Sequence, residues 1–367
     1  MRVVVAPDSF GGTLTAPEAA RAIAEGWARH APDDDLVLAP MADGGPGFVD
    51  VLQASLGGDL QVQTVAGPYG DDVPLAWLLD DGTAYVESAQ ACGLHLTDRR
   101  EPLVASTVGV GQALAAAADG GARRIVVGLG GSATNDGGAG LLSALGATAD
   151  VPLDAGPAAL RGVTQVDLAP ARERLAGVDL VIASDVDSTL LGMFGATKTF
   201  GPQKGLDEEQ ILTVDALLDR FVDAACGATP AERRTADQPG AGAAGGLGFA
   251  LMLLGGERTS GIDLVAEAVG LSALAASADL LISGEGQYDF QSRAGKVVFG
   301  VAQTAAAAAR PCVVLAGQVD VGGREMRAMG VESAYSMADV VGLEAALSDP
   351  HTSLATLAER VARTWSR

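Results

Sequence analysis

Acidic side chains follow several of the apolar strands that the sequence predicts, and these residues are the best suited to chemistry. Asp8, Asp43, Asp136, Asp185 and Asp289 each stand in a polar or Gly-containing turn after such a strand. In open α/β sheets, ligands bind outside the carboxyl ends of the strands. A single aspartate is more often a turn or cap residue. Five in the same topological position favour a shared acidic cleft.

Crowded carboxylates need a counter-charge, and the sequence offers two kinds. Lys204 lies in residues 200–205, which we interpret as a Gly/Pro loop, and Lys296 precedes a predicted helix. Mg²⁺ is a hard ion that takes oxygen ligands. Phosphoryl transfer needs a phosphate cradle, a metal and an oriented hydroxyl more than a strong nucleophile. These residues therefore indicate a metal-dependent phosphotransferase.

A Gly-rich turn at residues 128–138 joins a predicted strand to a predicted helix. Glycines there let a backbone approach a ligand closely, and free N–H groups favour an anion. Thr134, Asn135 and Asp136 add a hydroxyl, an amide and a carboxylate. For this turn alone, a structural role, with Thr134 or Asn135 as the helix cap, is as good an interpretation as a binding role.

The same turn has a second interpretation. Residues 128–133 fit the Gly-x-Gly-x-x-Ala dinucleotide fingerprint, with Asp150 as the acid that follows. A lone match is weak, and Asp136 would compete with a pyrophosphate at the helix start. A further match at residues 240–245 follows no strand.

The elements that must position these residues change in kind along the chain. Strands and helices alternate before residue 58 and after residue 279, which is typical of a parallel sheet. Between residues 60 and 87, three strands with short turns indicate an antiparallel meander. We therefore predict an α/β fold with two domains, residues 1–58 with 272–367 and residues 59–271.

Composition excludes several classes of protein. The 367 residues carry a formal charge of −22, which disfavours nucleic acid and anionic membranes as partners. Three widely spaced cysteines, no signal peptide and no long apolar run predict a cytoplasmic protein. The histidines lack zinc-ligand spacing. Neither a Gly-x-Ser-x-Gly motif nor a Walker-type P-loop occurs.

Several stretches together resemble the bacterial glycerate kinase family, of the glycerate 2-kinase type. In family order over nearly the whole chain, they are APDSF (6–10), PMADGG (40–45), GGSATNDGG (130–138), SDV (184–186), FGPQKG (200–205), GAAGGLG (242–248), GEG (284–286) with Asp289, GK (295–296) and AYSMAD (334–339). The resemblance implies a flavodoxin-like parallel-sheet domain with a second α/β domain inserted into it. It also implies ATP-dependent phosphorylation of glycerate with Mg²⁺.

With this resemblance, each candidate residue takes an expected role. The catalytic candidates are Asp185, Asp289 and Lys296. The substrate-binding candidates are Asp8, Ser9, Asp43, Gly44, Ser132, Asn135 and Gln287. The ATP-binding candidates are Gly130, Gly131, Thr134, Lys204, Gly245 and Glu285. The metal-binding candidates are Asp43, Asp136 and Asp185. A small hydroxy acid and ATP are the expected partners, and a homodimer is compatible with the sequence.

Four positions depart from the family pattern. Gly11 replaces a lysine, Pro46 a glutamate and Gln287 an arginine, and Asp187 stands where asparagine is preferred. A lost arginine–carboxylate bond costs about 1.5–3 kcal/mol. Either other groups hold glycerate, or the substrate is not glycerate but another acid, such as a closely related hydroxy acid. Two alternatives stay open, a kinase-like metabolite binder without activity and an NAD-dependent oxidoreductase.

Overall fold

The computed structural model describes residues 1–289 and 297–366, and the chain forms two compact units. Unit 1 comprises Met1–Asp43, Asp50–Gly57 and Ser260–Arg367, and unit 2 comprises Gly44–Val49 and Gly58–Thr259. The return to unit 1 at Ser260 comes earlier than the domain boundary at residue 272 that we expect from the sequence.

Unit 1 is built on a five-stranded sheet in the order β13-β12-β11-β1-β2, and all of its strand pairs are parallel. The strands are β1 (Arg2–Val5), β2 (Asp35–Leu38), β11 (Leu280–Tyr288), β12 (Cys312–Val319) and β13 (Ser333–Ser336). Counted along unit 1, this is the 2-1-3-4-5 order of flavodoxin-like folds, which confirms the predicted fold class. In such a sheet the strand order reverses between β1 and β11. Ligands bind next to this point, outside the carboxyl ends of the strands.

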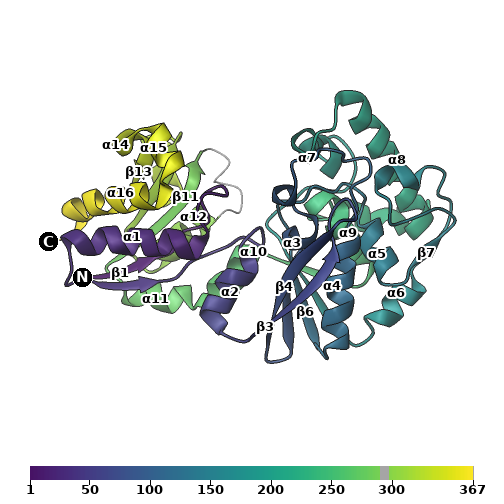
Figure 1. Ribbon diagram of the computed structural model, residues 1–367, viewed down its shortest axis with the longest axis horizontal. Helices are drawn as coiled ribbons and strands as arrows, with labels where there is room; N and C mark the ends of the chain where they lie inside the picture. The colour runs from purple at the N-terminus through teal and green to yellow at the C-terminus, as the bar shows by residue number, and fades with distance from the viewer. Residues whose placement is uncertain (290–296, 367) are drawn as a thin grey trace. The chain divides into compact units, whose positions relative to one another are not determined.

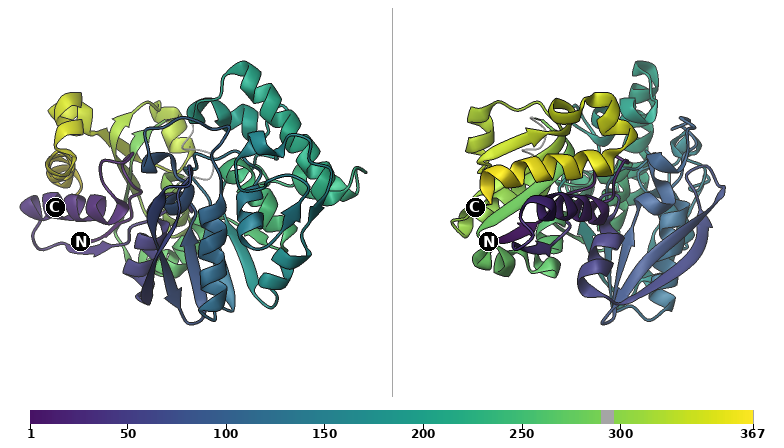
Figure 2. Two further views of the ribbon diagram at one scale, coloured as in Figure 1. Left: turned by 45° about the vertical axis from the view of Figure 1, so that its right-hand side comes forward. Right: turned by 60° about the vertical axis from the view of Figure 1, so that its left-hand side comes forward.

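Helices α1 (Ala16–His30) and α16 (Pro350–Trp365) lie side by side on one face of this sheet (Figures 1 and 2). Their apolar side chains share a core with Val3, Val5 and Ile282. Helix α1 begins at the predicted capping box, because Thr15 accepts from Glu18 N and the Glu18 side chain accepts from Thr15 N.

The remaining helices of unit 1 complete its layers. Helices α11 (Leu271–Ser277) and α12 (Val297–Ala307) contact β1, β11 and β12, and they share no residue with the α1–α16 core. The others are most of α2 (Phe48–Leu56), α10 (Gly261–Val269), α13 (Gly323–Ala328), α14 (Met337–Val341) and α15 (Leu343–Ser348).

Strand β11 is longer than the sequence suggests. We expected a strand over residues 280–283 followed by a Gly-rich loop, but β11 pairs with β12 as far as Tyr288. Glycine is needed at 284 because a Cβ there would lie 2.4 Å from the Leu315 carbonyl oxygen of β12. Glu285 and Gln287 therefore stand on a strand and not in a loop.

Unit 2 is built on a six-stranded mixed sheet in the order β10-β9-β6-β5-β4-β3. Strands β5, β6, β9 and β10 are parallel, whereas β3, β4 and β5 form the predicted antiparallel meander. Asp81 and Gly82 both have positive φ between β4 and β5, which suits a tight hairpin turn. The strands are β3 (Asp59–Ala66), β4 (Asp72–Asp80), β5 (Thr83–Glu87), β6 (Arg124–Gly128), β9 (Asp179–Ala183) and β10 (Glu257–Thr259), with a separate pair β7 (Thr148–Ala149) and β8 (Val166–Asp167).

The helices of unit 2 include one that we did not predict. Residues 200–205 are not a loop, since helix α7 spans Ala196–Lys204 and ends at Gly205 with φ +101°. Pro202 lies inside this short helix, and Lys204 is its last residue. The other helices are α3 (Ala89–Cys92), α4 (Val108–Asp119), α5 (Ala139–Ala144), α6 (Ala169–Arg174), α8 (Glu208–Cys226) and α9 (Ala243–Leu253).

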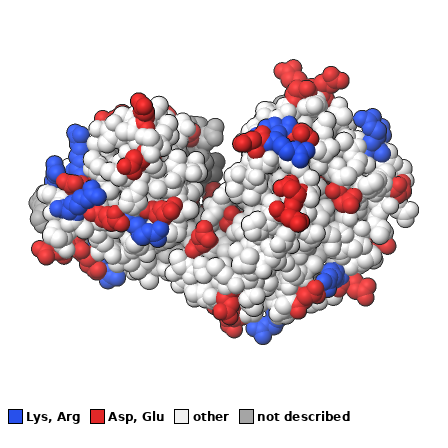
Figure 3. Space-filling model, viewed as in Figure 1, with Lys and Arg blue, Asp and Glu red and all other residues white. Residues whose placement is uncertain are grey.

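On the face seen in Figure 3, cationic side chains are scattered among acidic ones and form no continuous basic patch. This agrees with the negative charge of the chain. Within residues 1–289 and 297–366, no helix is both long and apolar enough to cross a lipid bilayer.

Candidate functional site

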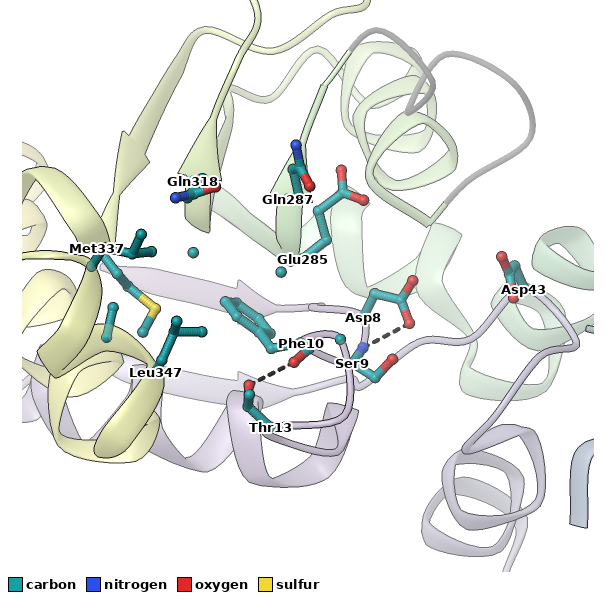
Figure 4. A pocket seen from close by; sticks show the side chains of 15 residues that line it. Asp8, Ser9, Phe10, Thr13, Asp43, Glu285, Gln287, Gln318, Met337 and Leu347 are labelled. Carbon is teal, nitrogen blue, oxygen red and sulfur yellow. Dashed lines mark hydrogen bonds between the residues drawn. The ribbon is translucent and has the colours of Figure 1, made fainter. Parts of the chain in front are cut away.

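A cavity of about 590 Å³ opens in unit 1 at the carboxyl ends of its strands. Figure 4 shows that its two ends differ in chemistry. Asp8, Asp43 and Glu285 stand toward one end, and Met337 and Leu347 toward the other, with Phe10 between them. This cavity therefore lies at the edge of the parallel sheet where a ligand is expected.

The acidic end brings together Asp8 after β1, Asp43 after β2 and Glu285 within β11. Burial raises the pKa of Asp8 well above its usual range, and repulsion from Asp43 and then from Glu285 adds to this effect. The Ser9 amide donates to Asp8 Oδ1 at 2.7 Å and opposes the shift in that pKa. Because a nearby cation would relieve this repulsion, the carboxylates suit a divalent metal ion.

The apolar end is formed mainly by helices α14 and α15. Met337 is buried, whereas Leu343 is 49 % exposed and Leu347 is 61 % exposed. Large apolar side chains that line a cavity while open to solvent are suited to cover a flat, weakly polar group such as a nucleotide base.

Two departures from the family pattern line this same cavity. Nothing lies within 4 Å of a Cβ built at Gly11, so the cavity has space for a longer side chain at this position. The backbone there has φ +54°, which would be strained for any residue other than glycine. Gln287 donates from Nε2 to Asp320 Oδ2 at 3.1 Å. Neither residue brings a positive charge to the cavity.

A second, smaller cavity of about 90 Å³ lies within unit 2. Gly130, Gly131, Ser132, Lys204 and Gly245 line it, so five of the predicted binding residues meet here. Lys204 is 2 % exposed, and its Nζ donates to Ser132 Oγ at 3.0 Å and to the Thr134 carbonyl at 2.6 Å. Burial lowers the pKa of Lys204 to about 8.

Glycine is required at this cavity by close approach of the chain to itself. Gly245 has φ +70°, and a Cβ there would lie 2.0 Å from the Thr134 carbonyl oxygen. The same oxygen accepts from Lys204. The Gly245 turn therefore packs against the carbonyl that holds the lysine.

Asp136 lies deep in unit 2 and is fully buried. Its carboxylate accepts from Thr107 N, Thr107 Oγ1, Gly138 N and Gly140 N at 2.8–3.2 Å. Burial raises the pKa of Asp136, and these donors oppose the shift. The bonds join the turn before α5 to the start of α4 and give Asp136 a structural explanation.

The other predicted site residues are divided between the two units. Asn135 is buried and donates to Thr197 Oγ1 at 2.8 Å. Gly44 belongs to unit 2, where a Cβ would lie 2.5 Å from the Ala183 carbonyl oxygen, whereas Asp43 belongs to unit 1. Asp185 follows β9, and Asp289 follows β11.

Lys296 lies outside the described residues. In the part of the chain that the structure describes, no three His, Cys, Asp or Glu side chains are grouped closely enough to hold a metal ion by themselves. A magnesium ion bound by one or two carboxylates would therefore need oxygen ligands from elsewhere, such as a phosphate.

Sequence reasoning did not identify the apolar wall of the larger cavity. Phe10 lies between Ser9, a predicted binding residue, and Gly11, a departure from the family pattern. This position could have indicated that Phe10 lines the site. Leu343 and Leu347 gave no signal, because leucines four residues apart are typical of any amphipathic helix.

Comparisons with known proteins agree on one family over the whole chain. The model of the glycerate kinase family matches residues 3–366. Glycerate kinase of Bacillus subtilis is 39 % identical over 99 % of this chain and 96 % of its own length. Glycerate 2-kinase of Escherichia coli is 37 % identical over 99 % and 98 %.

A solved structure gives the same result. A crystal structure from Salmonella typhimurium LT2, assigned to glycerate kinase 2, superimposes with a TM-score of 0.81 at 35 % identity and covers 100 % of this chain and 98 % of that one. With the family model and the full-length relatives, this shows that the chain belongs to the glycerate kinase family.

Proposed function

We propose that this protein is a phosphotransferase that uses ATP to phosphorylate a hydroxyl of glycerate, giving 2-phosphoglycerate, and that it acts in the cytoplasm. The observation that carries this proposal is the cavity of unit 1, where carboxylates and an apolar wall meet at the carboxyl edge of a flavodoxin-like sheet. Full-length relatives named glycerate kinase and glycerate 2-kinase support the reaction.

The larger cavity is better suited to the nucleotide than to the acid. The sequence predicts that Asp8, Ser9, Asp43 and Gln287 bind the acid. However, the three carboxylates that line this cavity would repel the carboxylate of glycerate. A magnesium nucleotide brings its own cation, and its base suits Met337 and Leu347. We therefore place ATP here, and one or two of the carboxylates of Asp8, Asp43 and Glu285 would hold Mg²⁺ together with oxygen ligands from the phosphates.

The chemistry that a magnesium ion would supply here is positive charge that offsets the charge of the phosphates. The protein groups that remain for orienting the acceptor hydroxyl are Asp185 and Asp289, and Lys296 is the candidate to contact the transferred group. Asp185 follows a parallel strand of unit 2 and Asp289 a parallel strand of unit 1.

A coupled assay of ADP release tests the reaction. We expect turnover with ATP, Mg²⁺ and glycerate that exceeds turnover with other short hydroxy acids, and nuclear magnetic resonance of the product should show a phosphate on O2. Turnover that favours another hydroxy acid would point to the departures at Gly11 and Gln287 as substrate determinants. No ADP release with any acid would contradict the kinase.

The oxidoreductase alternative is disfavoured by the site geometry. A dinucleotide needs free N–H groups at the helix that follows the Gly-rich turn. Here Gly138 N and Gly140 N, at the start of α5, already donate to the Asp136 carboxylate. The cavity of about 90 Å³ beside this turn is also far too small for a dinucleotide.

A further inference from the structure

Lys204 is a buried cation that forms no ion pair with any described residue. Both oxygens that accept from its Nζ are neutral, the Ser132 hydroxyl and the Thr134 carbonyl. Lys204 takes part in none of the ion pairs between described residues, whereas Lys198 on the same helix pairs with Asp215 at 3.3 Å. A buried ammonium without a carboxylate is costly, so it calls for an explanation.

The titratable groups near Lys204 do not form an ion pair with it. Cys92 and Asp136 are the titratable neighbours that influence its pKa. Burial raises the pKa of the Cys92 thiol, which therefore stays neutral. The Asp136 carboxylate lies close enough to favour the ammonium, but its hydrogen bonds go to Thr107, Gly138 and Gly140 and not to Lys204.

The choice of a lysine is itself informative. Only three of the 24 cationic residues are lysines, so this chain uses arginine almost everywhere else. An ammonium is a compact point charge on a flexible stem, whereas a guanidinium is a wide planar fork. A cavity of about 90 Å³ has room for the first beside a small anion.

We propose that Lys204 binds the carboxylate of the acceptor acid in the small cavity of unit 2, and so selects an acid over a neutral alcohol. The inference rests on the proposed function for the identity of the acid. It departs from the sequence-based expectation that Lys204 faces a phosphate. Size supports it, because this cavity accommodates a carboxylate and its neighbouring carbons but not a nucleotide.

Steady-state kinetics of Lys204→Met test the proposal, with Lys198→Met as the matched control on the same helix. We expect the KM for glycerate to rise about 10- to 100-fold in Lys204→Met, the usual effect of losing a hydrogen bond to a charged group. The KM for ATP should change less than about threefold. The preference for glycerate over its neutral amide, glyceramide, should fall by the same factor, and Lys198→Met should leave all three values unchanged.

Calorimetric titration with glycerate alone separates this inference from the kinase proposal. If wild type binds glycerate and Lys204→Met does not, the carboxylate site stands even when no ADP is released. Equal binding by both proteins, or no binding by wild type, would overturn it. A selective rise in the KM for ATP would assign the cavity to a phosphate and also overturn it. Lys204→Gln, which keeps a donor for Ser132 and Thr134, provides the same comparison if Lys204→Met does not fold.

Discussion

Asp136 is a buried carboxylate whose oxygens accept from two backbone amides of its own turn and two donors of Thr107. The sequence predicts Asp136 as a metal ligand, because it follows a strand. In the structure it joins the Gly-rich turn to the start of α4. We therefore expect the loss of these hydrogen bonds to lower the free energy of unfolding of the protein.

Replacing Asp136 by alanine should lower the free energy of unfolding by about 3 kcal/mol, because four donors inside unit 2 lose their acceptor. Urea unfolding of the variant and wild type measures this loss. Asp187→Ala is the control, since the Asp187 side chain is 81 % exposed. A variant of unchanged stability that instead requires more Mg²⁺ would support Asp136 as a metal ligand and contradict this structural role.

Lys204 makes the stability of the protein depend on pH in an unusual direction. Its pKa is about 8 when folded, below the ordinary value of 10.5. Between these two values the unfolded chain binds more protons, so folding becomes more favourable as pH rises. Relative to Lys204→Met, wild type should gain up to about 3 kcal/mol between pH 7 and pH 10.5.

Urea unfolding of both proteins at pH 7 and pH 10 measures that gain. Comparing the difference between the two proteins removes the other groups that titrate in this range. Lys198→Met should show a much smaller change. A difference that is the same at both pH values would contradict the lowered pKa of Lys204.

At the scale of elements, the contact between α1 and α16 depends on a glycine. A Cβ at Gly26 would lie 1.9 Å from the Ala355 carbonyl oxygen of α16. Gly26→Ala must therefore push the helices apart, and overpacking of this kind costs about 1–3 kcal/mol.

Thermal unfolding should show the effect as a lower melting temperature for Gly26→Ala. Gly323→Ala in α13 is the matched control, because nothing lies within 4 Å of a Cβ there. Alanine is the better helix former, so the control should be neutral or slightly stabilising. An unchanged melting temperature for Gly26→Ala would mean that the two helices are not in tight contact.

The elements that sequence reasoning found are those whose signals are local. The capping box at Thr15 and the positive-φ turn at Asp81 and Gly82 are both readable from neighbouring residues. The errors at β11 and α7 have one cause. Glycine and proline were taken as breaks, but Gly284 is needed for close packing on β12, and Pro202 is tolerated inside a short helix.

The candidate site likewise has parts that local sequence predicts and parts that only the tertiary fold determines. The acids of unit 1 and the glycines of unit 2 follow from the rule that ligands bind at strand ends. The grouping of Gly130, Ser132, Lys204 and Gly245 around one small cavity needs the tertiary fold, because α7 brings Lys204 to a turn 70 residues away in sequence. The wall formed by Leu343 and Leu347 likewise depends on where α15 packs.

At the scale of the molecule, the two proposals assign different ligands to different units. An ATP analogue that is not hydrolysed, added with Mg²⁺, should slow amide hydrogen exchange at residues 8–13 and 285–288 in unit 1. Glycerate should slow exchange at residues 130–135 and in α7 of unit 2. At 100 times its dissociation constant, a ligand stabilises its site by about 2.7 kcal/mol, or about 100-fold in exchange.

Mass spectrometry of exchanged peptides measures this protection, with each ligand tested separately. Residues 148–167, which include β7 and β8, line neither cavity and are an internal control. Protection by glycerate at residues 8–13 would return the acid to the cavity of unit 1. Protection by the nucleotide at residues 130–135 would place a phosphate beside Lys204.

The pairing of β1 with β11 also has a consequence for how the protein is made. Val3 finds its partner Leu280 only after the whole of residues 58–259 has been synthesised. At about 5–20 residues per second, β1 and β2 wait tens of seconds for the strand that completes their sheet. Unit 2 has all of its chain outside the ribosome earlier and can fold first. The nascent strands Arg2–Val5 and Asp35–Leu38 are then the segments most in need of a chaperone.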